Sequence, residues 1–420
     1  MLPVDAVPAA VMEVVRGLRA GGYAAFLVGG CVRDLLRGEK PKDFDLATSA
    51  RPEQVQRLFK RVIPTGIEHG TVTVVVHKEH VEVTTFRAEA EYVDGRRPSK
   101  VEFHEDIAAD LSRRDFTMNA IAWEPETNTL VDPFHGQEDL AAKIIRAVRV
   151  PLERFLEDGL RPLRAVRFAT VLDFTIEPET EAAITQTLHV FRKVATERIQ
   201  QEFVKLLLAP AAPKGLELLR RTGLLAEFLP EAMHANFAAV GRAPRDEVVR
   251  LAVLLSGVPK ARELVLRLKF PNKVADEAGA LAAETTLPAL DASDADLRRW
   301  LSKLTAARAL PLFDVHQALQ PGDGALRKRV EALLATNPPL TTRALALDGK
   351  GLMEALGTGP SPVVGQATRY LLEAVLEDPA RNSPEGLKAL LHAFPQGFPH
   401  ATPPDDPPLP PGTGSARKKA

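Results

Sequence analysis

A glycine pair followed by two aspartates is the part of the sequence best suited to chemistry. Gly29 and Gly30 follow the short apolar run 25–28, and Asp43 and Asp45 come soon afterwards. The run predicts a buried strand, and the glycines let the backbone turn tightly from it into a helix. The start of a helix attracts phosphates, because its N–H groups are free and it carries the positive end of the helix dipole.

The spacing of the two aspartates indicates metal binding. If residues 44–47 form a strand, its alternation sends Asp43 and Asp45 to one face while Phe44 packs on the other. Such oxygen ligands suit Mg²⁺. Two carboxylates can hold a pair of ions, one to activate an attacking hydroxyl and one to neutralise a leaving pyrophosphate. A solvated acidic loop is the alternative, but with the glycine turn the pair predicts metal-dependent nucleotidyl transfer.

A second charged segment spans residues 113–120. Arg113 and Arg114 can bind phosphates through paired N–H groups, and Asp115 or Asn119 could bond a ribose hydroxyl. The pattern predicts that the two arginines precede a helix that starts at Asp115. An exposed charged helix capped by the aspartate is the other interpretation.

A third charged segment spans residues 157–168. Arg161, Arg164 and Arg167 recur every third residue after Asp158, so they share one row of a predicted helix. By themselves they would be ordinary ion pairs on a helix surface.

Length and composition point to a soluble protein of several domains. The chain has 420 residues, of which 45% are hydrophobic and 26% charged. Its formal charge of −1 offers no overall attraction to nucleic acid, so RNA contacts would need local basic patches. One cysteine excludes an internal disulfide, and residues 11–18 read as an amphipathic helix and not a signal peptide. With no apolar run of membrane-spanning length, we expect a cytoplasmic protein that contacts no membrane.

Strand signals are confined to the first third of the chain. The runs 25–28, 44–47, 71–76 and 81–86 are rich in β-branched and apolar residues, and the last two predict a hairpin. Beyond residue 137, apolar residues recur at spacings of three and four, which is typical of helices. The fold class is therefore predicted to be α+β.

Taken in order, these segments resemble the class II tRNA nucleotidyltransferases. These are the bacterial CCA-adding enzymes, a branch of the polymerase β superfamily that also contains poly(A) polymerases. The resemblance covers roughly residues 20–230, and its motifs lie at 27–34, 43–45, 65–74, 83–87, 113–120, 132–134 and 157–168. Their shared order makes chance similarity improbable.

The resemblance implies template-independent addition of CMP and AMP, from CTP and ATP, to the 3′ end of tRNA. It makes Asp43 and Asp45 ligands of Mg²⁺. Glu82 is a candidate third catalytic carboxylate, although an exposed glutamate on a hairpin explains it nearly as well. The predicted nucleotide-binding residues are Gly29, Gly30 and Arg33 at the triphosphate, Arg113, Arg114, Asp115 and Asn119 at phosphates and ribose, and Asp158, Arg161, Arg164 and Arg167 in the helical segment.

Within that set, the resemblance assigns base reading to Asp158 and Arg161, and hydrogen-bond chemistry supports the assignment. Cytosine and adenine both carry an exocyclic amine beside an unprotonated ring nitrogen, which a carboxylate and a guanidinium match. Guanine and uracil place a carbonyl oxygen where the amine would be, which leaves the carboxylate unpaired. Hydrogen-bonding sites can reject such mismatches by ~10⁴-fold.

Two alternatives lie within the same superfamily. The polar segment 88–104 resembles a loop of enzymes that add the terminal A, which argues against CC-only addition but leaves A-only addition open. Residues 61–76 resemble the tRNA enzymes, whereas poly(A) polymerases carry a basic segment near this point. A non-catalytic tRNA-binding relative would be expected to lack the aspartate pair, which this chain retains.

The resemblance also implies a domain order. It predicts a nucleotidyltransferase head at 1–138, a helical neck at 139–212, a helical body at 213–335 and a helical tail at 336–394, followed by a disordered Pro-rich segment at 395–420. The body and tail would bind tRNA by shape. Candidate phosphate contacts are Arg192, Lys193, Arg198, Arg220, Arg221, Arg298, Arg299 and Lys303. The sequence does not determine the oligomeric state.

Overall fold

The computed structural model describes residues 2–88, 106–284, 286–322 and 324–394, and the backbone of three two-residue strands between residues 88 and 106. The loop predicted at 88–104 lies mostly outside the described residues. The predicted Pro-rich segment 395–420 lies entirely outside them. The chain divides into two compact units, Met1–Thr286 with Leu310–Asp323, and Leu287–Ala309 with Gly324–Ala420.

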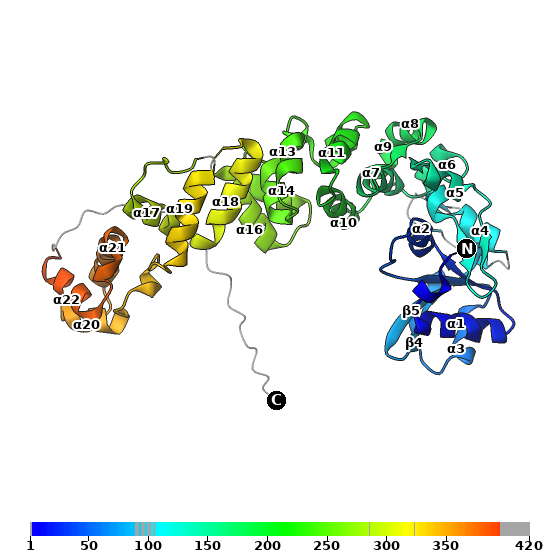
Figure 1. Ribbon diagram of the computed structural model, residues 1–420, viewed down its shortest axis with the longest axis horizontal. Coiled ribbons are helices and arrows are strands. Elements are labelled where there is room, and N and C mark those ends of the chain that lie inside the picture. Colours follow the sequence, from blue (N-terminus) through cyan, green and yellow to red (C-terminus); the bar gives the residue numbers. More distant parts are fainter. Residues whose placement is uncertain are drawn as a thin grey trace. The chain divides into compact units, whose positions relative to one another are not determined.

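A mixed sheet forms the N-terminal part of the first unit (Figure 1). Among the described residues its order is β11-β10-β1-β2-β5-β4-β3. The strands are β1 (Ala25–Val28), β2 (Asp45–Thr48), β3 (Val62–Gly66), β4 (Thr71–Val76), β5 (Glu79–Thr85), β10 (Ala122–Glu124) and β11 (Thr129–Val131). The predicted hairpin is β4 with β5, and β2 pairs with β5 in parallel.

The β4–β5 hairpin has one apolar and one polar face. Val72 and Val74 of β4 and Val81 and Val83 of β5 are buried in the core that α1 (Ala9–Ala20) covers. The helices α1 and α3 (Pro52–Leu58) lie beside these strands (Figure 1). Because side chains alternate along a strand, the threonines and Glu82 between the valines point to the other face. That polar face carries the candidate site.

Short helices lie between or directly after the strands of this part of the chain. They are α2 (Gly30–Leu36) directly after β1, α4 (Ile107–Ser112) and α5 (Gly136–Ala141). The first unit continues with α6 (Pro151–Glu157), α7 (Arg161–Val171), α8 (Pro178–Gln186), α9 (Leu188–Phe191), α10 (Thr196–Leu207), α11 (Ala212–Arg221), α12 (Leu224–Phe228), α13 (Phe237–Arg242), α14 (Glu247–Leu254), α15 (Ala261–Arg267) and α16 (Asn272–Ala283). The predicted α+β class, a mixed-sheet head with a helical remainder, is confirmed.

The second unit is helical in its described residues. It contains α17 (Asp294–Leu304), α19 (Gly324–Ala335), α20 (Gly349–Leu356), α21 (Pro362–Glu377) and α22 (Pro384–His392), and α18 (Ala306–Leu319) has residues in both units. Arg298 of α17 is buried and donates to the carbonyl oxygens of Leu376 and Glu377. The prediction that Arg298 contacts tRNA phosphates is therefore wrong, because its guanidinium holds the end of α21.

None of the described helices combines the length and the apolar character that crossing a membrane requires.

Candidate active site

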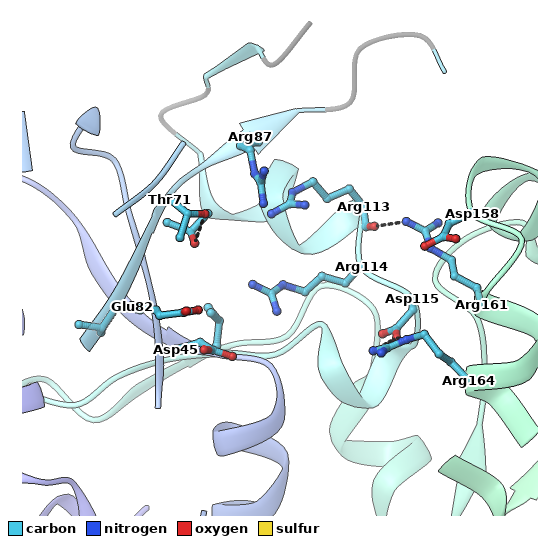
Figure 2. A pocket seen from close by; sticks show the side chains of 13 residues that line it. Asp45, Thr71, Glu82, Arg87, Arg113, Arg114, Asp115, Asp158, Arg161 and Arg164 are labelled. Atoms are coloured by element: carbon cyan, nitrogen blue, oxygen red, sulfur yellow. Dashed lines mark hydrogen bonds and ion pairs between the residues drawn. The ribbon is translucent and has the colours of Figure 1, made fainter. Parts of the chain in front are cut away.

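The predicted site residues from separate segments converge on one cavity of about 460 Å³ (Figure 2). It lies beside the polar face of β5, and α7 contributes to the opposite wall. The predicted residues that line it are Asp45, Glu82, Arg113, Arg114, Asp115, Asp158, Arg161 and Arg164. The predicted residues that do not line it are Gly29, Gly30, Arg33, Asn119, Arg167 and Asp43. Gly29, Arg33, Asn119 and Arg167 act on the cavity through neighbours described below.

Two carboxylates stand side by side at one end of the cavity. Asp45 begins β2 and is the register partner of Glu82 in β5, so both side chains lie on the polar face of the sheet (Figure 2). Burial raises the pKa of the Asp45 carboxyl; Arg114 opposes this rise, and the negative charge of Asp43 adds to it. A second positive charge near Asp45, such as a bound cation, would favour its ionised form.

Asp43 precedes the strand. The strand predicted over 44–47 is β2, which begins one residue later, at Asp45, so Asp43 is not part of the strand. Asp43 instead lines a second cavity, which also contains Asp45 and Glu82. Within the described residues, no group of three or more acidic, histidine or cysteine side chains already has a metal-binding arrangement.

The glycine turn lies beneath an arginine. Gly29 has φ of 75°, in the left-handed region, and a Cβ atom there would come within 2.9 Å of Nη1 of Arg114. Glycine is therefore needed both for the turn and for the close approach of this guanidinium. Gly30 begins α2, as expected for a turn that leads from β1 into a helix.

Arg113 and Arg114 follow a helix and do not begin one. They come directly after α4, and the helix predicted to start at Asp115 is only the short 3₁₀ helix Thr117–Asn119. Asp110 of α4 accepts hydrogen bonds from Arg113 at 2.8 and 3.0 Å and from Arg114 at 3.1 Å. Burial alone would raise the pKa of Asp110, but the two guanidiniums outweigh it and lower that pKa. A buried, ionised carboxylate thus holds both arginines toward the cavity.

Four residues of the site were missed from the sequence. Asp110 could have been found, because acids three and four residues before a basic pair stabilise helical ion pairs. Arg87 lines the cavity just after the strand that carries Glu82, and Thr71 and Thr84 line it from β4 and β5. The same alternation that placed Glu82 on the polar face also indicates Thr84, which is two residues further along.

A charged network joins the sheet region to α7 and α10. One oxygen of Asp115 accepts from Nε and Nη2 of Arg164 at 2.9 and 2.7 Å, and the other accepts from Asn119. Burial penalises the Asp115 charge, but Arg164 and the Asn119 hydrogen bond outweigh it and hold the pKa at about 2. Glu202 of α10 accepts from Arg167 at 2.7 Å and lies 3.7 Å from Arg164.

The same network reaches the helix that follows the glycine turn. Nη1 of Arg33 donates to the Asn119 side chain at 2.9 Å, and its Nε donates to Asp34. Arg33 therefore acts on the cavity through Asn119 and Asp115. The predicted roles of Asp115 and Asn119 at the ribose stay predictions; in this structure the two side chains bond each other.

The predicted base-reading residues are held separately. Asp158, which ends α6, accepts from the Leu160 amide at 3.0 Å and from Arg198 at 2.8 Å. Arg161 donates to the backbone carbonyls of Arg154 at 2.9 Å and Arg113 at 3.0 Å (Figure 2). The two do not pair with each other in the described part of the chain. Arg161 instead forms an ion pair with Glu157, four residues earlier, so a helical ion pair of the kind considered from the sequence is present. Both line the cavity.

Comparison with known proteins agrees with this arrangement. Residues 25–146 match the family described as "Poly A polymerase head domain", and residues 173–235 match "Probable RNA and SrmB- binding site of polymerase A". The CCA-adding enzyme of Geobacillus stearothermophilus is 39% identical over 389 residues, covering 90% of this chain and 95% of the relative. That of Levilactobacillus brevis is 37% identical over 358 residues, covering 84% and 89%.

Solved structures show the same fold. The crystal structure of the Bacillus stearothermophilus CCA-adding enzyme in complex with CTP superimposes with a TM-score of 0.81 at 35% identity, covering 94% of this chain and 98% of that one. The Thermotoga maritima CCA-adding enzyme complexed with tRNA matches with a TM-score of 0.65 at 20% identity, which supports the fold alone.

The acids on a mixed sheet, the arginine-lined cavity and the helical remainder define a nucleotidyltransferase with a polymerase β-like head. At 39% identity over nine-tenths of its length, the chain belongs to the CCA-adding enzyme family, and the predicted family is confirmed.

Proposed function

We propose that this protein adds CMP and AMP, without a nucleic-acid template, to the 3′ end of tRNA to complete the CCA terminus. One observation carries the proposal: the acids Asp45 and Glu82 and the base-reading candidates Asp158 and Arg161 line one cavity, in a chain 39% identical to a CCA-adding enzyme over nine-tenths of its length.

The arginines fit a triphosphate. Arg87, Arg113, Arg114, Arg161 and Arg164 all line the cavity, and Figure 2 shows Arg87, Arg113 and Arg114 extending over the space beside Asp45 and Glu82. A guanidinium can donate two parallel hydrogen bonds to phosphate oxygens. We infer that Arg113 and Arg114, held by Asp110, hold the phosphates of CTP or ATP next to the acids.

The reaction is a substitution at the α-phosphorus of the nucleotide. The 3′ oxygen of the RNA forms a new bond to that phosphorus, the bond to the bridging oxygen of the β-phosphate breaks, and pyrophosphate leaves while the hydroxyl proton passes to solvent. Attack in line with the leaving group needs the acceptor to come from the side opposite the pyrophosphate.

Family membership implies a divalent cation, and we propose Mg²⁺ held by Asp45 and Asp43, with Glu82 as an additional ligand. The donors are hard oxygens. Burial and, after it, the negative charge of Asp43 raise the pKa of Asp45, and a bound cation would oppose this rise. When bound, Mg²⁺ supplies charge neutralisation for the leaving pyrophosphate and acidifies the attacking hydroxyl.

Nucleotide selection is assigned to the opposite end of the cavity. Asp158 would accept a hydrogen bond from the exocyclic amine of cytosine or adenine, and Arg161 would donate to the neighbouring ring nitrogen. Arg198 and the Leu160 amide already fix the Asp158 carboxylate, so its orientation is established before the nucleotide binds. Uracil or guanine would leave this carboxylate facing a carbonyl oxygen.

Recognition of tRNA is assigned to the helices. We retain the division into head (1–138), neck (139–212), body (213–335) and tail (336–394) as a proposal, with the body and tail measuring the shape of the tRNA. Several candidate phosphate contacts are already paired: Arg192 with Glu227 and Arg221 with Glu181. These exposed pairs are weak and can exchange an acid for a phosphate.

The test uses two tRNA transcripts, one ending at the discriminator base and one ending after CC, with CTP and ATP offered singly and together. Complete CCA addition predicts that the first transcript gains three nucleotides only when both are present, and that the second gains one from ATP alone. An enzyme that adds only A would extend the second and leave the first untouched. A long ladder with ATP alone would show a poly(A) polymerase.

A further inference from the structure

A second cavity, of about 590 Å³, lies against the same acids as the first. Asp45 and Glu82 line both cavities, and Asp43 lines only the second. The register explains this placement, because Glu82 pairs across the sheet with Asp45 on one side and with Thr73 on the other. The acids thus border both cavities, and the second also extends to Pro8 and Val11 at the start of α1.

The two cavities differ in charge. Five arginines are among the residues that line the first, whereas the basic side chains among the described residues that line the second are Lys42 and His80. A nucleoside triphosphate needs the concentrated positive charge of the first. The second suits a partner that carries little negative charge beside the acids.

Hydroxyl groups line the second cavity next to Glu82. The hydroxyls of Thr65 in β3 and Thr73 in β4 lie 3.0 Å apart and form one hydrogen bond. Within the described residues neither makes another, so this bond uses one of their two O–H donors and leaves one to give to a ligand. Thr73 is only 5% exposed, so its polar group would profit from a partner in the cavity.

Part of the lining is apolar. Pro8 and Val11 near the start of α1, Phe44 before β2 and Ile63 of β3 all contribute to it. Unstacked bases of single-stranded RNA bind against aromatic and apolar side chains, while the 2′-hydroxyl meets polar groups. Acids, a hydroxyl pair and an apolar wall together match a nucleoside at the end of an RNA strand.

We propose that this second cavity binds the 3′-terminal nucleoside of the acceptor RNA, with the Thr65–Thr73 hydroxyl pair bonding its 2′-hydroxyl. The inference rests on the proposed function and adds a binding site for the 3′ end of the acceptor RNA. The 3′-hydroxyl must reach the acids, and Thr73, the register partner of Glu82, is close enough to the acids to meet the vicinal 2′-hydroxyl. Placing the acceptor across the acids from the triphosphate also provides the approach that in-line attack requires.

The test compares two acceptors that differ only in the terminal sugar. One tRNA transcript lacking CCA ends in an ordinary ribonucleotide, and the other ends in a 2′-deoxynucleotide that keeps its 3′-hydroxyl. The ratio of kcat/KM for the two acceptors, at saturating CTP, measures recognition of the 2′-hydroxyl. For the wild type we expect the ribose end to be preferred about tenfold, the value of one neutral hydrogen bond.

Thr73→Val and Thr65→Val remove the hydroxyls at nearly constant shape. Each is expected to bring the ratio close to one while the KM for CTP stays near its wild-type value, and Thr73→Ser is expected to keep the preference. Thr84→Val is the matched control, because Thr84 lies on the same face but lines the first cavity, where it bonds Thr71. Its ratio should equal that of the wild type. Thermal unfolding of each variant verifies the fold. Thr65 is exposed, so Thr65→Val can still be measured if Thr73→Val is unstable.

Other results overturn the inference in identifiable ways. A wild type that extends both acceptors equally, or folded Thr73→Val and Thr65→Val variants that keep the full preference, would show that the hydroxyl pair does not contact the acceptor. An equal loss of preference in Thr84→Val would place the acceptor in the first cavity. If the wild type extends neither acceptor with CTP and ATP, the proposed function itself is wrong, and so is the proposed binding site for the acceptor end.

Discussion

Replacing Asp115 by asparagine tests the charged network that joins the sheet region to α7. Asparagine keeps the shape of the side chain and can still bond Asn119, but it removes the charge that faces Arg164 at 2.7 and 2.9 Å. The Asp115 side chain is 10% exposed, so water screens the pair little. The variant isolates the contribution of one buried negative charge.

The magnitude follows from the pKa. Arg164 and Asn119 overcome the cost of burial and lower the pKa of Asp115 from 3.8 to about 2. Each pKa unit corresponds to about 1.4 kcal/mol, so the ionised carboxylate stabilises the folded state by about 2.5 kcal/mol at neutral pH. Folding lowers the pKa of Asp115, so this stabilisation is complete at pH values above the pKa of the carboxyl in the unfolded chain. It disappears as the pH falls through the pKa of the carboxyl in the folded protein. About half should remain at pH 3 and little at pH 2.

Urea unfolding of wild type and Asp115→Asn at several pH values measures this difference. We expect the variant to lose about 2–3 kcal/mol at pH 7, with the gap between the two proteins closing progressively below pH 4. Asn119→Ala, which leaves the charge in place, should keep most of the pH dependence. Equal stabilities at pH 7, or a gap that persists undiminished at pH 2, would refute the reasoning.

Three further substitutions test the site by activity. Asp45→Asn should lower kcat for CTP addition by more than about 100-fold, because a ligand of the metal is lost, and Mg²⁺ should no longer raise its Tm; normal turnover would remove Asp45 from the centre. Asp158→Ala should raise incorporation of UTP and GTP relative to CTP by about 10- to 100-fold while turnover persists, whereas unchanged rejection would contradict base reading. Gly29→Ala should cost about 1–2 kcal/mol of stability and raise the KM for CTP, since the left-handed turn is strained and the added methyl displaces Arg114; a fully active, equally stable variant would contradict this.

The local sequence pattern was sufficient to predict most helices and strands and most of the residues that line the cavity. Alternation in β5 placed Glu82 on the polar face, and the three-residue spacing placed Arg161 and Arg164 on one helix row. The order of the motifs identified the family. These features depend on neighbours in the chain, which a sequence shows directly.

The errors arose where distant residues decide the outcome. Arg298 looked like a surface cation, but its partners are carbonyls nearly eighty residues away. The spacing likewise did not indicate that Asp158 bonds Arg198, forty residues later. Asp43 precedes β2 because pairing with β1 and β5 begins only at Asp45. The spacing of residues along the chain does not indicate tertiary partners of this kind.

Sequencing the RNA product tests the central claim most directly. A tRNA transcript ending at its discriminator base is incubated with the protein, Mg²⁺ and all four nucleoside triphosphates, and the 3′ ends are then sequenced. The account predicts that nearly every extended molecule ends in CCA and stops there. Tails of adenosine, frequent uridine or guanosine, or extension beyond three nucleotides would contradict it.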